Sequence, residues 1–294
     1  MRTLLALTLL LGASGAAAQQ NFDAVQIKTT DLGQGLYVLY GAGGNIGVSA
    51  GPDGIVLIDD QFAPLAPKIR TALAAISPQP LRFVLNTHWH FDHTGGNEAF
   101  GSQGALIVAH HNVRKRMAED RFMEAFKREV TPAPAKALPV VTFGQDVRFH
   151  LNGLELHAFH LPAAHTDGDA VVWWPAANVL HMGDLYFNGS YPVIDWGSGG
   201  RIDGVIDAVS RVLPMIDDKT RIIPGHGPLS NKSELIAYRA MLSTVAARLK
   251  ALKAEGKTLE QVLAAQPTAD YDATWGGGFM KPQPWVEMVW NGLR

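Results

Sequence analysis

The sequence predicts an α/β fold in which two β-sheets pack face to face and helices cover their outer faces. Two observations lead to this prediction. A β-rich stretch followed by strands and helices occurs twice along the chain, which favours two sheets that each have their own helices. No stretch rich in Pro, Gly or Ser separates the two halves, so we expect one continuous domain over residues 19–294.

The first half begins with short β-branched or aromatic runs separated by glycine-rich turns, which is typical of strands joined by hairpins. A helix that begins at Pro64 follows, since proline is favoured in a first turn. We expect strands over 36–40, 46–50, 55–59, 81–87 and 105–110, helices over 64–76 and 111–128, and a proline-containing loop over 131–139.

The second half repeats this order without a detectable sequence repeat. We expect strands over 140–143, 146–151, 154–160, 170–174, 178–182 and 220–223, and helices over 203–213, 231–254, 258–265 and 284–292.

The first residues form three zones typical of a secretory signal. Arg2 supplies a positive charge, the run from Leu4 to Leu11 is apolar but too short to span a membrane, and Ala16 to Ala18 offers a small-residue cleavage site. We therefore predict a signal peptide over residues 1–18 and a periplasmic or secreted mature chain. No later stretch holds 18 uncharged apolar residues, so we predict no membrane span.

Composition narrows the classes of function. The 294 residues carry 25 Lys and Arg against 27 Asp and Glu, a formal charge of −2, so we expect no nucleic-acid partner. The chain has 0 cysteines, which excludes disulfides, thiolate metal sites and a cysteine nucleophile. A small-molecule substrate is the expected partner, and the sequence assigns neither an oligomeric state nor substrate-binding residues.

The densest group of potential metal ligands follows the strand expected at 81–87. His88, His90, Asp92 and His93 fall within six residues. Neither a strand nor a helix can point all four side chains to one side, because its periodicity separates them. A tight loop at the strand end can do so, and we expect a metal site there. Imidazole and carboxylate ligands without thiolate suit Zn²⁺, and also Fe or Mn.

Three further candidate ligands lie at other predicted strand ends. His165, Asp184 and His226 each follow a strand and stand close to Gly or Pro, where loops turn. With the first cluster they would complete a site for two metal ions. Six other histidines are expected to be structural or surface residues, namely His110, His111, His150, His157, His160 and His181.

These motifs, in this order, resemble those of the metallo-β-lactamase superfamily. They are the His-x-His-x-Asp-His pattern at 88–93, Pro162 with His165, Gly183 with Asp184, and the Pro-Gly-His-Gly run at 224–227. The resemblance implies a four-layer αβ/βα sandwich of two mixed β-sheets, with the metals at one edge.

The resemblance also implies how two zinc ions would be held. One would lie on His88, His90 and His165, the second on Asp92, His93 and His226, with Asp184 bridging them. A metal-bound hydroxide would be the nucleophile, and Asp92 would act catalytically by orienting it or moving its proton. Asp59 is similar to an early Asp of the family that supports the metal loops.

Two positions depart from the best-known β-lactamases of the family. Those enzymes have Cys at the position of Asp184 and a substrate-binding Lys at that of Phe187. The pattern is closer to the thioesterase, lactonase and phosphodiesterase branches. The flavodiiron branch has Glu where this chain has His90, so an iron redox role is disfavoured.

Several residues near the motifs are candidates for a substrate pocket. Trp89 and Phe91 either line it or pack the loop, and packing is favoured. A wall could be formed by Tyr186, Asn188, Tyr191 and Trp196, with Asn188 donating to a carbonyl. Arg201 and Lys232 are candidate anchors for a substrate carboxylate.

Three functions follow from these observations. The preferred one is an exported dinuclear zinc hydrolase that opens cyclic amides as β-lactamases do, with weak or promiscuous activity; export favours it. The alternative is hydrolysis of esters, thioesters or lactones on the same site, which Asp184 favours. The third is a non-catalytic exported metal-binding protein, against which the complete ligand set argues.

Overall fold

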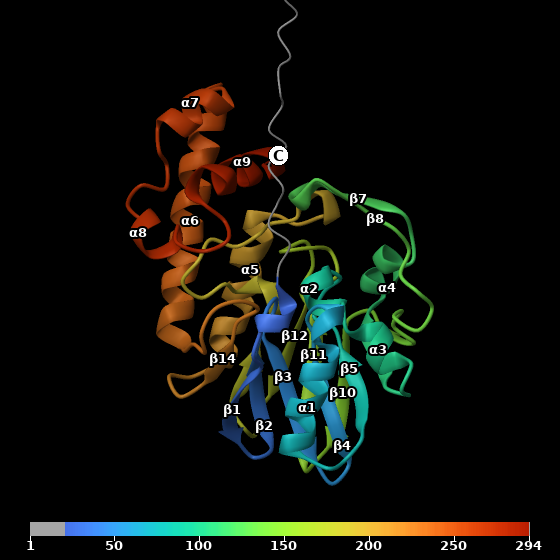
Figure 1. Ribbon diagram of the computed structural model, residues 1–294. Coiled ribbons are helices and arrows are strands. Elements are labelled where there is room, and N and C mark those ends of the chain that lie inside the picture. Colours follow the sequence, from blue (N-terminus) through green and yellow to red (C-terminus); the bar gives the residue numbers. More distant parts are fainter. Residues whose placement is uncertain (1–20, 294) are drawn as a thin grey trace, which may run out of the picture.

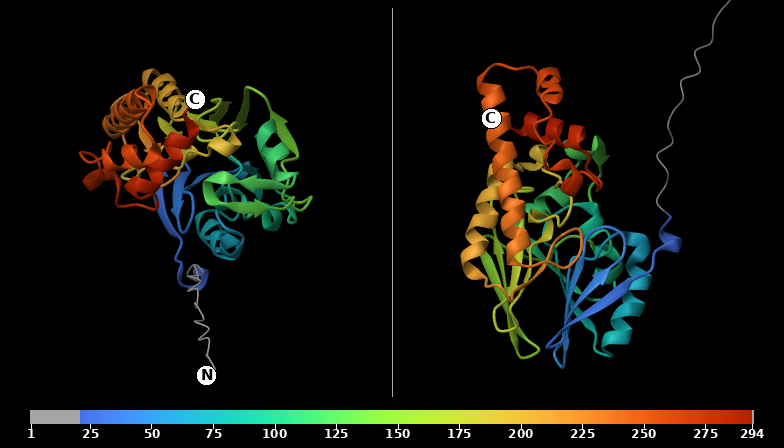
Figure 2. Two further views of the ribbon diagram at one scale, coloured as in Figure 1. Left: turned by 90° about the horizontal axis from the view of Figure 1, so that it is seen from above. Right: turned by 90° about the vertical axis from the view of Figure 1, so that its left-hand side faces the viewer.

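The computed structural model describes residues 21–293, so the signal peptide predicted at 1–18 lies outside the described residues (Figure 1). Two β-sheets pack face to face, and helices lie on both outer faces. In the right-hand view of Figure 2, α1 (Ala66–Ile76) lies outside one sheet, and α5 (Ile202–Val212) and α6 (Lys232–Ala254) lie outside the other. The predicted α/β sandwich is confirmed.

The first sheet has seven strands in the order β1-β2-β3-β4-β5-β6-β9. Their bounds are β1 (Lys28–Gly33), β2 (Leu36–Tyr40), β3 (Ile46–Gly51), β4 (Gly54–Ile58), β5 (Leu81–Leu85), β6 (Leu106–His110) and β9 (Val141–Phe143). β1 to β4 pair antiparallel, whereas β4, β5, β6 and β9 pair parallel, so the sheet is mixed.

The second sheet has five strands in the order β10-β11-β12-β13-β14. They are β10 (Asp146–Leu151), β11 (Leu154–His160), β12 (Ala170–Trp174), β13 (Val179–His181) and β14 (Arg221–Ile223). Only β13 and β14 pair parallel. A separate hairpin is formed by β7 (Arg121–Met123) and β8 (Arg128–Val130).

Apolar side chains fill the three interfaces between the four layers. Val38 and Ile58 of the first sheet share a buried cluster with Val172 of the second sheet. Leu39, the next residue after Val38, belongs instead to the cluster beneath α1, because successive strand residues face opposite sides. Successive side chains of β2 thus pack into two different interfaces, one between the sheets and one beneath α1.

Shorter helices complete the fold. They are α2 (Phe91–Thr94), α3 (Asn97–Gly101), α4 (His111–Met117), α7 (Leu259–Ala264), α8 (Asp272–Trp275) and α9 (Pro282–Gly292). None of the helices in the described part of the chain is long and apolar enough to cross a membrane.

The prediction of a helix over 111–128 is wrong beyond its first two turns, because α4 ends at Met117. Val113 and Met117 are buried on one face, but the next position on that face is Arg121, so the apolar stripe ends. The chain instead forms the β7–β8 hairpin, whose tip carries Phe126. Strand β1 was not expected, because Leu32 is its only buried residue and it shows no apolar alternation.

Candidate metal centre

All seven predicted ligands meet at one edge of the sandwich. Asp184 and His226 follow the parallel neighbours β13 and β14, and the 88–93 cluster follows β5, itself parallel to β4. Carboxyl ends of neighbouring parallel strands share an edge, which brings the loops of each sheet together. A backbone hydrogen bond from Asn45 N to Gly225 O (2.7 Å) joins the two sheets at this edge.

The 88–93 cluster is part turn and part helix. Residues 88–90 lie in an irregular turn, and α2 begins at Phe91, so Asp92 and His93 project from its first turn. The tight loop expected for all four ligands is therefore right for the two ligands that precede α2.

The ligand atoms form two adjacent groups. In the first, one atom from each of four buried residues, His88, His90, His165 and Asp184, lies within 4.8 Å of the others. In the second, Asp92, His93 and His226 meet the same limit. This is the same division of ligands that the family resemblance implied.

Asp184 lies between the two groups and directs one carboxylate oxygen to each. Its Oδ2 is 3.5 Å from His165 Nε2 and 3.7 Å from His88 Nε2. Its Oδ1 is 3.0 Å from His93 Nε2 and 3.4 Å from His226 Nε2. The arrangement suits a carboxylate that bridges two cations.

Asp59 orients two of the histidines, as expected of a residue that supports the metal loops. His93 Nδ1 donates to Asp59 Oδ2 at 2.8 Å. Thr87 Oγ1 donates to the same oxygen at 2.7 Å and can therefore accept from His88 Nδ1 at 3.0 Å. Asp59 is fully buried and has a φ of 63°, a left-handed conformation in which its carboxylate contacts His93 directly and His88 through Thr87.

Two partners outside the predicted set orient the remaining buried histidines. His90 Nε2 donates to Asp195 Oδ2 at 3.0 Å, and His165 Nδ1 donates to the carbonyl of Val193 at 2.7 Å. Each bond fixes which ring nitrogen carries hydrogen and leaves the other nitrogen facing the group. Asp195 is not among the predicted site residues, because it stands 105 residues from His90 and follows no predicted strand.

The donor set fits metal ions. His165 Nε2 and His90 Nδ1 face each other at 3.0 Å, and the bonds above place hydrogen on the opposite nitrogen of each ring. Two lone pairs at this distance repel unless a cation lies between them. His88 Nε2 is likewise buried and has no hydrogen-bond partner, and such a group is rare without a ligand.

Protonation of the first group agrees with this interpretation. Burial lowers the pKa of His165 to about 4 and that of His88 well below its usual value, so both rings are neutral near pH 7. Neutral imidazole is the form that binds metal. Burial also opposes charge on His226, yet Asp184 and Asp92 raise the pKa of His226 to about 9, which marks a point where positive charge is favoured.

Two glycines permit the close approach of the loops. A Cβ on Gly225 would lie 2.0 Å from Asp184 Oδ1, and one on Gly44 would lie 2.1 Å from the His93 ring. Any side chain at these positions would displace a ligand.

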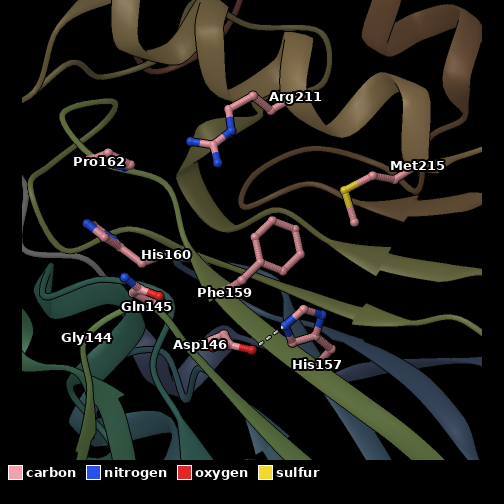
Figure 3. A pocket seen from close by; sticks show the side chains of 9 residues that line it. All are labelled: Gly144, Gln145, Asp146, His157, Phe159, His160, Pro162, Arg211 and Met215. Atoms are coloured by element: carbon pink, nitrogen blue, oxygen red, sulfur yellow. Dashed lines mark hydrogen bonds and ion pairs between the residues drawn. The ribbon is translucent and has the colours of Figure 1, made fainter.

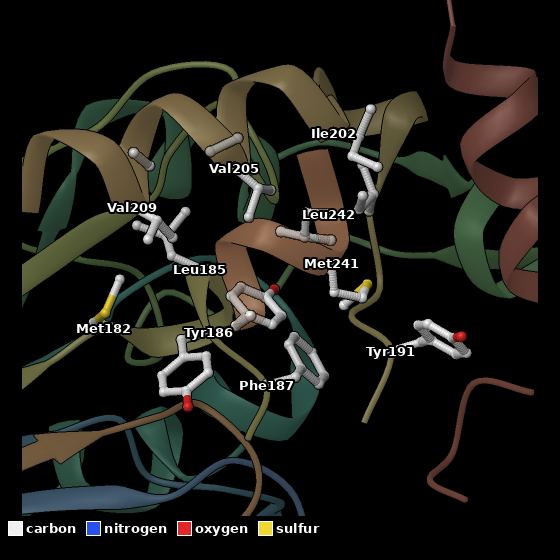
Figure 4. Packing of buried hydrophobic residues seen from close by; sticks show 14 of the residues in the cluster. Met182, Leu185, Tyr186, Phe187, Tyr191, Ile202, Val205, Val209, Met241 and Leu242 are labelled. Carbon is white, nitrogen blue, oxygen red and sulfur yellow. The ribbon is translucent and has the colours of Figure 1, made fainter. Parts of the chain in front are cut away.

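The segment that carries Asp184 is anchored by a large apolar cluster (Figure 4). Leu185 and Tyr186 pack in this cluster with Val205 and Val209 of α5. Since these side chains are buried, the position of Asp184 is fixed by core packing rather than by the loop alone.

A cavity of about 470 Å³ opens onto the centre. His90, Asp92, Asp184 and His226 are among the residues that line it. Its other lining residues are Gly43, Phe62, Phe91, Phe126, Phe187, Ser190, Tyr191, Val193 and Phe279.

The residues considered for the substrate pocket are mostly placed elsewhere. Only Phe91 and Tyr191 line this cavity. Trp89 is buried in a separate cluster, as the packing interpretation expected. Asn188 donates to Pro228 O at 3.2 Å, and Lys232 donates to Ile216 O at 2.7 Å.

Tyr186, Trp196 and Arg201 are likewise absent from the lining of the cavity. Tyr186 is buried, and its hydroxyl lies 2.8 Å from Ser230 Oγ. Arg201 precedes the first turn of α5.

A second hollow, of about 670 Å³, contains no predicted ligand (Figure 3). It lies beside β11 and the end of α5, where His157 Nε2 is 3.0 Å from Asp146 Oδ2. His160, which also lines it, is 2.8 Å from Asp169 O through Nδ1. Both histidines have structural partners, as expected for these residues.

Comparison with known proteins identifies the family. The model of the metallo-beta-lactamase superfamily matches residues 40–227, which include all seven ligands and Asp59. The chain belongs to this superfamily. In fold it is similar to a metallo-beta-lactamase from Pontibacter korlensis, with a TM-score of 0.59 and 22% identity over 74% of this chain and 99% of that one.

Curated relatives of this superfamily member include a hydroxyacylglutathione hydrolase and an acyl-coenzyme A thioesterase. A hydroxyacylglutathione hydrolase from Polaromonas sp. is 29% identical over 171 residues, 57% of each chain. An acyl-coenzyme A thioesterase from Bos taurus is 25% identical over 157 residues, 48% of this chain and 54% of that one. The chain thus spans little more than half the length of these relatives.

Proposed function

We propose that the chain is an exported hydrolase that uses two zinc ions to cleave acyl esters, thioesters or lactones. The observation that carries the proposal is the convergence of seven His and Asp side chains beside a cavity that four of them line. Nε2 of His88, one of the seven, is buried there without a hydrogen-bond partner. A non-catalytic role is disfavoured because this ligand set opens onto a cavity rather than being enclosed.

The zinc ions would be held by the two groups described above, with Asp184 common to both. When bound, two divalent cations supply a nucleophile from water at neutral pH and polarise the scissile carbonyl. His90 and His165 are held in the correct tautomers by Asp195 and Val193, so this half of the centre needs little reorganisation.

Asp92 is the residue best placed to handle protons. It lines the cavity, and its Oδ2 lies 3.3 Å from His226 Nε2. His93 and His226 beside it hold the pKa of Asp92 below its usual value against the opposing effect of burial, so it is a carboxylate near pH 7. We propose that Oδ2 takes the proton that the attacking water loses as its oxygen bonds to the acyl carbon. Asp92 then passes this proton to the leaving oxygen or sulfur as the acyl bond breaks.

Acyl-oxygen or acyl-sulfur substrates are favoured over cyclic amides by two observations. Of the two relatives described above, one is named a thioesterase and the other a hydrolase of hydroxyacylglutathione. The residues that line the cavity include neither Lys nor Arg, so a substrate carboxylate such as that of a β-lactam has no cationic anchor among them. The β-lactamase prediction stays a second candidate, favoured by the secretory signal predicted at residues 1–18.

A substrate panel tests the proposal. Purified full-length protein, loaded with zinc or treated with chelator, is assayed on a β-lactam, a lactone, a thioester, an ester and a phosphodiester. We expect chelator-sensitive turnover of the ester, thioester or lactone. Turnover of the β-lactam alone would establish the second candidate, and no turnover by protein that holds two zinc ions would leave the accessory role.

A further inference from the structure

The walls of the cavity above the metal centre are aromatic. Four phenylalanines from four different segments form a continuous row, with ring centroids 5.8 Å apart for Phe62 and Phe91, 5.5 Å for Phe91 and Phe126, and 6.4 Å for Phe126 and Phe279. Phe187 stacks on the ring of His226 at 4.8 Å, so an aromatic ring also covers the second group of ligands.

Phe126 and Phe279 bring this row over the centre from two separate overhangs. Phe126 lies at the tip of the β7–β8 hairpin, and its ring meets that of His90 edge to face at 5.4 Å. Phe279 lies between α8 and α9, where a β-bridge joins Tyr191 to Met280. The two rings thus flank the entrance above a metal ligand.

Phe279 has an exposed apolar surface that a ligand would cover. Its side chain is 77% exposed, the largest value among the large hydrophobic residues in the described part of the chain. A phenyl ring left in water forgoes the free energy that burial provides. Because Phe279 also lines the cavity, an apolar group bound in the cavity would bury its exposed ring.

Polar groups of these walls are already satisfied. The hydroxyl of Tyr191 donates to Asp272 Oδ1 at 2.8 Å, and its ring stacks on Trp285 at 4.2 Å. Tyr191 therefore offers the cavity its ring and no free hydroxyl. Apart from the metal ligands, Ser190 is the only other residue of the lining with a polar side chain.

Several cations lie near the overhangs, among them Lys127, Arg128 and Lys281, but none of them lines the cavity. The guanidinium of Arg128 packs over the ring of Phe91, 5.0 Å from its centroid. Lys281 Nζ donates to Gly277 O at 3.0 Å. Within the lining of the cavity, a charged group held against Phe126 and Phe279 therefore meets no Lys or Arg side chain.

We propose that Phe126 and Phe279 form an aromatic clamp that selects acyl substrates with an uncharged aromatic or alkyl group. This inference rests on the proposed hydrolase function. The acyl carbonyl would lie at the metal ligands, and its apolar group would lie in the cavity against the two rings, whose centroids are 6.4 Å apart. A charged acyl group would lose its hydration there without gaining a partner.

Two ratios of kcat/KM test the clamp in the zinc-loaded, full-length protein. The first compares para-nitrophenyl phenylacetate with the acetate ester, and the second compares the pentanoate ester with the mono-ester of glutarate, which has a carboxylate on a similar chain. We expect both ratios to exceed about tenfold in the wild type, the size of effect that an apolar pocket provides.

The matched variants are Phe126→Ala, Phe279→Ala and, as control, Phe122→Ala. Phe122 lies on the same hairpin and is 52% exposed, but it does not line the cavity. We expect the phenylacetate-to-acetate ratio to fall about tenfold in each of the first two variants and to change less than about twofold in the control. Equal ratios in all four proteins would overturn the clamp.

Binding of a ketone separates failure of the clamp from failure of the proposed function. Benzylacetone and acetone, which cannot be hydrolysed, are titrated into zinc-loaded wild type and Phe279→Ala. If no ester is cleaved but benzylacetone binds more tightly than acetone in the wild type only, the clamp stands and the acyl hydrolase does not. Ester turnover without a preference among acyl groups would contradict the clamp alone. Absence of both ester turnover and preferential benzylacetone binding would contradict the clamp and the hydrolase function.

Discussion

His90 Nε2 and Asp195 Oδ2 form a buried hydrogen bond of 3.0 Å that joins a predicted metal ligand to a residue far away in the sequence. The bond leaves Nδ1 of His90 as the nitrogen that faces the first ligand group. A carboxylate behind a metal-binding histidine fixes its tautomer and raises its basicity.

Asp195→Asn should therefore weaken zinc binding about 10- to 100-fold, because the amide supplies no negative charge to His90. Competition with a metallochromic chelator measures the change. Asp203→Asn, which alters an exposed carboxylate paired with Lys250, is the control and should leave the affinity as it is. Equal affinities in both variants would show that Asp195 does not orient His90.

His90→Ala and Asp184→Ala should each abolish turnover while the fold is retained. Asp184 faces both ligand groups, so its loss leaves each group without a shared ligand. Activity assays with circular dichroism check this prediction. Full activity in either variant would mean that the ligand assignment is wrong.

Gly225→Ala should lower the metal content and the activity, because its Cβ would lie 2.0 Å from Asp184 Oδ1. Gly144→Ala is the matched control, since its Cβ would meet only His111 atoms at 3.7 Å and beyond. Metal analysis of both variants decides the matter, and a fully loaded Gly225→Ala protein is incompatible with the close packing described here.

A histidine pair away from the centre should make stability depend on pH. The rings of His110 and His160 stack at 3.8 Å, and burial together with His160 and His111 lowers the pKa of His110 to about 4. The unfolded chain, with a pKa near 6.5, binds the proton more readily. Stability from neutral His110 is thus complete above about pH 6.5 and declines as the pH falls toward about 4.

Urea unfolding of chelator-treated protein at pH 7 and pH 4.5 measures this effect. We expect the free energy of unfolding of the wild type to be lower at pH 4.5 than at pH 7. In His110→Gln this decrease should be smaller by about 1 kcal/mol. His150→Gln changes an exposed histidine and should behave as the wild type does. An identical fall in all three proteins would assign the acid sensitivity to other groups.

The sequence predicted the layers and the residues that meet at the candidate metal centre because both leave local signals. Runs of β-branched or aromatic residues mark strands such as β2, and His165, Asp184 and His226 stand close to turn residues after predicted strands. The sequence pattern of a strand is weakest where few of its residues are buried, as in β1. The end of a helix is hard to predict where an apolar stripe stops within a run of helix-forming residues, as at Arg121.

Residues that act through contacts between distant segments could not be predicted in this way. Asp195 meets His90 only after both sheets have packed, and Phe126 reaches the cavity from a hairpin that resembled a helix in sequence. No local sequence pattern around Asp195 or Phe126 indicates that the one orients a histidine or that the other lines the cavity. The core that holds Leu185 and Tyr186, and hence Asp184, likewise depends on helices from later in the chain.

The central claim is that the two ligand groups hold a pair of cations. Elemental analysis of freshly isolated full-length protein, normalised to protein concentration, tests it most directly. We predict two zinc ions per chain in the wild type and a clear loss in Asp184→Ala. Wild-type protein isolated without any bound transition metal would contradict the account.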